Sequence, residues 1–174
     1  MLLTRNGLTF SVDDAEVSRL VLERFNGIEA RLVSATHLPP RIGEVWRGQG
    51  GVYAGVMRGR DGGADYHLIA GPEHDDDIAW QPAMDWAPTV KVDGHADLVL
   101  PYLPELSVLR GNVPELFKRA YWSCETHAAH SSNAYYQDFK NGNQNYNNKD
   151  NQIRARLVRR SSGCFVGSGR PLFC

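Results

Sequence analysis

The sequence lacks the features that mark secreted, membrane-spanning and nucleic-acid-binding proteins. Its 174 residues contain no apolar run long enough for a signal peptide or for a transmembrane helix. The formal net charge is −1, so the chain has no basic excess that would draw it to nucleic acid or to an anionic membrane. These absences predict synthesis in the cytoplasm, no membrane span and no direct contact with nucleic acid.

Cysteine is also scarce, and its spacing matches no metal site. The three cysteines, Cys124, Cys164 and Cys174, are an odd number without the paired spacings of zinc ligands. We therefore expect free, reduced thiols. If the protein is exported, the alternative is a Cys164–Cys174 bridge that closes a short C-terminal loop.

The motifs that usually mark an active site are missing as well. Ser131-Ser132 has no Gly-x-Ser-x-Gly context, and the glycines at 48–51 precede a strand rather than a helix, so they predict no phosphate loop. Cys124, His127 and His130 have a spacing that suits a nucleophile with its base, or three metal ligands. Since no second cysteine or carboxylate completes either set, we interpret the histidines as surface residues. We predict no catalytic residue, no metal and no cofactor, and hence a protein that is not an enzyme.

One acidic run, residues 73–77, leaves two interpretations open. Clustered carboxylates suit a calcium ion, although the Asp-x-Asp-x-Asp-Gly spacing of an EF-hand is absent. The other interpretation is a solvated loop before a helix, with Asp76 or Asp77 as its N-cap. We favour the loop.

The first 38 residues predict a small α/β lead. Asn6-Gly7 separates two short apolar runs, which is typical of a hairpin. Ser11 followed by Asp14 is a capping box for a helix through about Phe25, and a strand is expected at 28–33. Consecutive prolines at Pro39-Pro40 mark the boundary of the lead. We expect the lead to pack on the main domain, and it also offers a contact for a homo-oligomer.

The main domain is expected over residues 39–160, with 161–174 as a C-terminal tail. Apolar alternation and glycine turns predict an antiparallel sheet, and two segments have helical spacing. Together they predict an α+β fold with two short helices, in which Trp122 is buried. The expected strands are 50–57, 66–70, 90–92, 120–123, 134–139 and 153–158, and the expected helices are 78–87 and 104–111.

The stretch between Asn141 and Asn151 is unusually polar, with six asparagines among its eleven residues. Buried amides without partners are costly, so the fold should display this stretch outward. Tyrosine and asparagine together suit a contact surface, because tyrosine gives large area and asparagine gives adaptable hydrogen bonds. A merely solvated polar hairpin is the alternative. The predicted partner-binding residues are Tyr135, Tyr136, Lys140, Asn143, Asn145, Tyr146, Asn147 and Lys149.

Several short motifs follow one another in a recognisable order over roughly residues 40–160. They are Leu100-Pro101 with Glu105-Leu106, Tyr121-Trp122-Ser123, Ala134 to Phe139 with Gly142, and Arg156-Leu157-Val158-Arg159. This order resembles the Lcl C-terminal domain family, found in phage, prophage and bacterial surface proteins and related to the C-type-lectin-like fold. The chain departs from the family pattern at Leu98, where an aromatic is usual, and at Leu157, where a cysteine is frequent. Both are packing positions.

The resemblance implies a C-type-lectin-like domain that is encoded by a phage or prophage. The expected function is non-enzymatic binding of a host protein or surface glycan, of the receptor-binding or adhesion type. Such a protein is made in the host cytoplasm and is carried in the virion if it serves adhesion. The alternative is a small cytoplasmic inhibitor that binds a host defence or regulatory protein, as anti-CRISPR proteins do.

Overall fold

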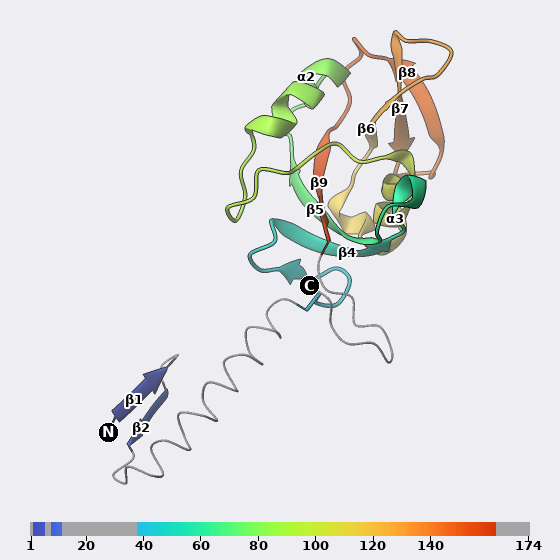
Figure 1. Ribbon diagram of the computed structural model, residues 1–174. Coiled ribbons are helices and arrows are strands. Elements are labelled where there is room, and N and C mark those ends of the chain that lie inside the picture. The colour runs from blue at the N-terminus through green and yellow to red at the C-terminus, as the bar shows by residue number, and fades with distance from the viewer. Residues whose placement is uncertain (1, 6–7, 12–37, 163–174) are drawn as a thin grey trace. The chain divides into compact units, whose positions relative to one another are not determined.

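The computed structural model describes residues 2–5, 8–11 and 38–162 (Figure 1). The chain divides into two compact units, Met1–Leu38 and Pro39–Cys174. In the first unit, β1 (Leu2–Arg5) pairs with β2 (Leu8–Ser11) in an antiparallel hairpin. This confirms the hairpin predicted from Asn6-Gly7. The predicted helix through Phe25 and the strand at 28–33 lie outside the described residues.

The second unit is built on a four-stranded antiparallel sheet with the order β3-β4-β5-β9. Its strands are β3 (Val45–Trp46), β4 (Gly51–Met57), β5 (Tyr66–Glu73) and β9 (Arg156–Ser161). A 3-10 turn, η1 (Arg60–Gly62), joins β4 to β5. Gly51 is required where β4 passes β5, because a Cβ there would collide with the carbonyl of Ala70.

Two short helices follow β5. The first is α2 (Trp80–Trp86), extended by the 3-10 turn η2 (Ala87–Thr89), and the second is α3 (Leu103–Asn112). The helix α3 begins at a proline-containing first turn, and Glu105 accepts the Tyr102 N–H at 2.7 Å, as in a capping box. The predicted N-cap of α2 is wrong: Ala79 occupies that position and makes no side-chain cap, because the helix begins later than expected.

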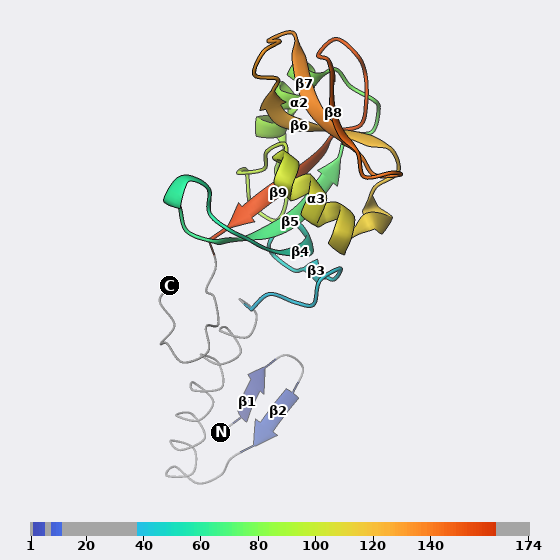
Figure 2. The ribbon, with the colours of Figure 1, turned by 90° about the vertical axis from the view of Figure 1, so that its right-hand side faces the viewer.

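The chain then forms a second sheet of three antiparallel strands in the order β6-β7-β8 (Figure 1). They are β6 (Ala120–Thr126), β7 (Asn133–Asp138) and β8 (Gln144–Asn148), and a 3-10 turn, η3 (Pro114–Leu116), precedes them. Figure 2 shows α3 beside both sheets. The Asn-rich stretch, expected only to be displayed outward, contains the strand β8. The predicted strand at 90–92 is wrong, since only an isolated bridge joins Val92 to His95, and the last strand begins at Arg156 rather than at 153.

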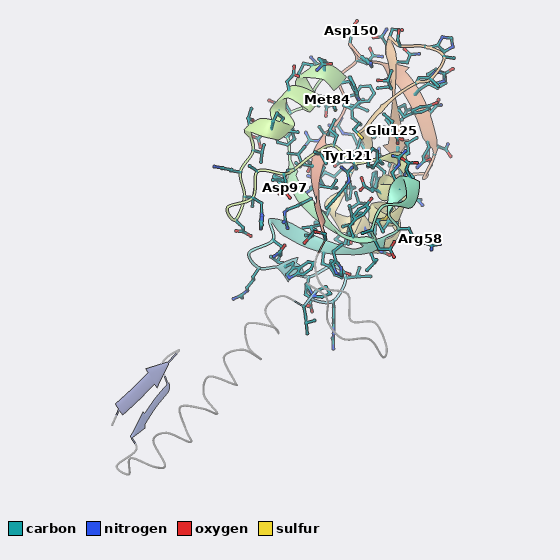
Figure 3. All side chains as sticks on the ribbon, in the orientation of Figure 1. Arg58, Met84, Asp97, Tyr121, Glu125 and Asp150 are labelled. Atoms are coloured by element: carbon teal, nitrogen blue, oxygen red, sulfur yellow. The ribbon has the colours of Figure 1, made fainter. Side chains whose placement is uncertain are left out.

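Two apolar clusters fill the space between these elements. One joins α3 to β4, β5, β6 and β9 around Tyr121, which Figure 3 labels in the interior. The other joins α2 to β6, β7 and β9 around Trp122, which is 0% exposed, so its predicted burial is confirmed. Leu98 and Leu157, the two departures from the family pattern, are both buried in the second cluster. The fold is α+β, with antiparallel sheets and two short helices, as predicted.

Candidate functional site

The β7–β8 hairpin carries most of the predicted partner-binding residues, and its turn is set by local hydrogen bonds. Asp138 accepts the Gly142 N–H on its carbonyl and the Lys140 N–H on Oδ1, both at 2.8 Å. Gly142 has φ 84°, a value that favours glycine, and a Cβ there would lie 2.8 Å from the Arg110 guanidinium. The turn therefore fixes the register in which Tyr135 pairs with Tyr146.

The strand β8 is an edge of its sheet, and its asparagines cap their own backbone. Asn145 Oδ1 accepts the Tyr146 N–H at 2.8 Å, and Asn147 Oδ1 accepts the Asn148 N–H at 3.0 Å. An edge strand normally leaves such outward N–H groups open to pairing with another chain. Here the side-chain oxygens satisfy them. This gives a physical reason for the asparagine content of a segment that forms no core.

The two faces of the hairpin differ. On one face, Ala134 and Tyr136 pack against Trp122 in the second apolar cluster, with the Tyr136 and Trp122 rings 6.4 Å apart and nearly perpendicular. At one end of the other face, Gln144 Nε2 donates to Gln137 Oε1 and to the Leu103 carbonyl, both at 2.8 Å, which ties the hairpin to α3. The hairpin is thus held on a packed scaffold from both sides.

Beyond that contact, four rings gather at the surface. We call His127, His130, Tyr135 and Tyr146 the ring cluster. The His127 ring lies 4.3 Å from the Tyr146 ring, 5.1 Å from the Tyr135 ring and 5.0 Å from the His130 ring, with the two imidazoles stacked at 19°. Tyr146 is 45% exposed and His130 is exposed, whereas His127 and Tyr135 are half-buried, so the cluster lies at the surface rather than in a core.

The predicted residues do not form a single surface. Tyr135 and Tyr146 lie together in the ring cluster. Tyr136 packs on the opposite face, and Lys149 lies over the Trp80 ring with its Nζ 4.1 Å from the ring centroid. Four others, which lie along the turn and the outer strand, are Lys140, Asn143, Asn145 and Asn147; of these, Asn147 is half-buried and the rest are exposed.

Sequence reasoning missed the two histidines, which it treated as unconnected surface residues. A usable signal existed. Once the turn at 140–142 is fixed, counting back along a paired β8 places Tyr146 opposite Tyr135. The asparagine-rich stretch has a low strand propensity, so the sequence does not predict this pairing. It does not predict the short return at 127–132 either, which brings His127 beside both tyrosines.

Half-buried charges hold the scaffold below the hairpin. Glu73 Oε1 accepts hydrogen bonds from Tyr121 Oη at 2.8 Å and Arg154 Nε at 2.7 Å, and its Oε2 accepts one from Arg156 Nη2 at 2.9 Å. Burial alone would raise the pKa of Glu73, but the hydrogen bonds from Tyr121 and Arg154 and the nearby arginine charges lower it below its ordinary value. The network joins β5, β6 and β9, so it has a structural role.

Cys124 borders a further feature that resembles a ligand site. It lies beside a hollow of about 510 Å³ with mostly apolar walls, whose lining includes Met84 and Asp97, both labelled in Figure 3. The charged residues of the hollow are already paired, Asp97 with Arg159 and Arg160 with Glu105. Burial raises the pKa of the Cys124 thiol to about 11, so the thiol is protonated at neutral pH and is a poor nucleophile.

The first and last residues of the acidic run at 73–77 are engaged by arginines. Glu73 binds Arg154 and Arg156 in the network described above, and Asp77 pairs with Arg119 at 2.9 Å and with Arg154 at 3.7 Å. Within residues 38–162, no group of three or more histidine, cysteine or acidic side chains is placed to hold a metal ion. None of the helices in the described part of the chain is long and apolar enough to cross a membrane.

Comparisons with known proteins add no relative. A scan against models of protein families finds none that matches this chain, and a search of curated proteins finds no match either. The ring cluster is therefore the candidate site on the strength of this chain's own residues.

Proposed function

We propose that this chain is a non-enzymatic binding protein, encoded by a phage or prophage, that contacts a host protein or surface glycan through the ring cluster. One observation carries the proposal. Tyr135 and Tyr146 lie on the face of the β7–β8 hairpin that does not pack on Trp122, and His127 and His130, from the turn between β6 and β7, lie against them at the surface. Aromatic rings that gather at the surface in such a group, rather than singly, are typical of an interaction site.

The chemistry of the surface suits recognition. Tyrosine rings supply contact area at a low cost in side-chain entropy, and tyrosine is frequent among the residues that dominate binding energy. Asn145 and Asn147 pair with Tyr136 and Ala134, so they lie on the other face of the hairpin from Tyr135 and Tyr146, and their Oδ1 atoms cap the backbone of their own strand. Lys140 adds an exposed positive charge at the turn. The ring cluster therefore combines aromatic contact area with hydroxyl and imidazole groups that can form hydrogen bonds.

The order of elements supports the proposed C-type-lectin-like scaffold and, with it, the resemblance to the Lcl C-terminal domain family. After β5 the chain runs through α2, α3 and the three-stranded sheet, and then returns as β9 to pair with β5. The β7–β8 hairpin thus lies in the segment between β5 and β9, two strands that pair in one sheet. Such a scaffold can display a variable surface without loss of its core.

The proposal is tested by capture with immobilised protein, from intact host cells and from soluble host lysate in parallel. The wild type should retain a specific partner, and a Tyr135→Ala/Tyr146→Ala variant should lose it. Retention from intact cells indicates adhesion, whereas a single soluble partner indicates the alternative role as an intracellular inhibitor. Equal capture by both proteins would reject the ring cluster as the contact surface.

A further inference from the structure

The turn between β6 and β7 is held by a histidine side chain. His127 Nδ1 accepts two backbone hydrogen bonds, from the Ala129 N–H at 3.2 Å and from the His130 N–H at 3.1 Å. The backbone closes the same turn, since the His127 N–H donates to the Asn133 carbonyl at 2.9 Å. His127 Nδ1 thus serves as the hydrogen-bond acceptor that a side-chain oxygen of asparagine or aspartate usually supplies in a turn.

This geometry fixes the protonation state of the ring. A backbone N–H can only donate, so Nδ1 must carry a lone pair, and the single ring proton must lie on Nε2. His127 is therefore neutral in this arrangement. A proton added at Nδ1 would face two N–H donors at hydrogen-bond distance and would remove both bonds.

The surroundings of the ring offer no compensation for a positive charge at Nδ1. The neighbours of the His127 ring are His130 in the same turn, Tyr135 on β7 and Tyr146 on β8. Within residues 38–162, no carboxylate forms an ion pair with the His127 ring; the nearby Glu125 binds Arg60 and the Leu103 N–H instead. The tyrosine faces attract a cation but offer no acceptor in place of Nδ1, so the Ala129 N–H loses its bond to the ring, whereas the His130 N–H keeps a longer bond to the His127 carbonyl at 3.3 Å.

The second histidine increases the effect that protonation has on the ring cluster. The His130 ring stacks on the His127 ring at 5.0 Å, so protonation of both would place two like charges in contact. The same ring that holds the turn also contacts Tyr135 and Tyr146. A change at His127 is therefore transmitted to the tyrosines through direct contacts.

We infer that the ring cluster is a pH-sensitive contact surface, which is assembled when His127 is neutral and comes apart when Nδ1 gains a proton. The effect on partner binding rests on the proposed function, whereas the switch itself does not. Partner affinity should fall about tenfold when the solution is acidified enough to protonate both histidines. A tenfold change is roughly the net contribution of one ordinary hydrogen bond.

The switch can be measured without a partner, by NMR of the whole chain. At neutral pH, long-range nitrogen–proton correlations should show the His127 proton on Nε2. On acidification, the amide signal of Ala129 should shift with the same midpoint as the His127 ring. A proton on Nδ1 at neutral pH, or amide signals that ignore the titration of His127, would overturn the inference.

Two variants separate the roles of the histidines. His130→Gln removes the second titratable ring and should keep the response of the Ala129 amide signal, because the acceptor at His127 remains. In this His130→Gln background, His127→Asn keeps an acceptor in the turn but cannot titrate, so the Ala129 amide signal should no longer follow pH. A response that survives in the double variant contradicts the inference, and if that variant fails to fold, the wild-type tautomer still decides. A chain that switches but captures no partner rejects the proposed function and leaves the switch standing.

Discussion

Removal of the guanidinium of Arg160 should be among the most destabilising single substitutions in the second unit. Glu105 is 0% exposed, and within residues 38–162 Arg160 is its only cationic partner. Arg160 donates from Nε at 2.7 Å and from Nη2 at 2.8 Å, and Tyr66 Oη donates at 2.6 Å. Arg160→Met removes the charge and two donors but keeps an unbranched apolar stem. Since this leaves an uncompensated buried carboxylate, we expect a loss of about 3–5 kcal/mol in the free energy of unfolding.

The assay is urea unfolding followed by tryptophan fluorescence. All four tryptophans lie between Trp46 and Trp122, so the signal reports on the second unit alone. The matched control is the double variant Glu105→Leu/Arg160→Met, which removes both charges and should lose markedly less than Arg160→Met. A loss below about 1 kcal/mol in the single variant, or no recovery in the double variant, would show that the pair is not buried as described.

Three further predictions concern the scaffold and its thiol. Trp122→Ala should cost about 3–5 kcal/mol in urea unfolding, because its ring is fully buried; a variant as stable as the parent would mean that β6 is not central. The pKa of Glu73 is lowered in the folded chain, so its stabilisation is present above the ordinary value of 4.5 and is lost as the pH falls through the folded value. Stability measured from pH 6 downward should therefore fall more steeply in the wild type than in Glu73→Gln, and parallel profiles would contradict this. In a Cys164→Ser/Cys174→Ser background, alkylation of Cys124 should stay slow at pH 8 and should accelerate toward its pKa of about 11; fast alkylation at pH 7 would refute the burial.

The sequence predicts those strands and helices at which the turn residues, the apolar pattern and the residue propensities all favour the same element. Glycine turns and apolar alternation located β4 and β5, and the Leu-Pro start with Glu105 located α3. The burial of Trp122 followed from its place in an aromatic strand. In each case the local preference and the tertiary environment favour the same structure, so the prediction holds.

The rest depended on tertiary structure. The strand β8 has an asparagine-rich sequence with low strand propensity, and it forms because it pairs with β7 and caps its own edge. Residues 90–92 have strand-forming side chains but find no neighbouring strand to extend. The role of His127 could not be read from its spacing to Cys124, because it depends on where the return at 127–132 places the ring.

The most direct test of the central claim is the change in partner affinity caused by a single exposed side chain. Tyr146→Ala removes a ring that is 45% exposed in the ring cluster, and Val56→Ala removes an apolar side chain that is 50% exposed on β4, outside the cluster. With the captured partner, Tyr146→Ala should raise the dissociation constant about 30-fold or more, as expected of a residue that dominates binding, and Val56→Ala should leave it unchanged. Equal affinities of Tyr146→Ala and the wild type, with both folded, would contradict the assignment of the ring cluster as the contact surface.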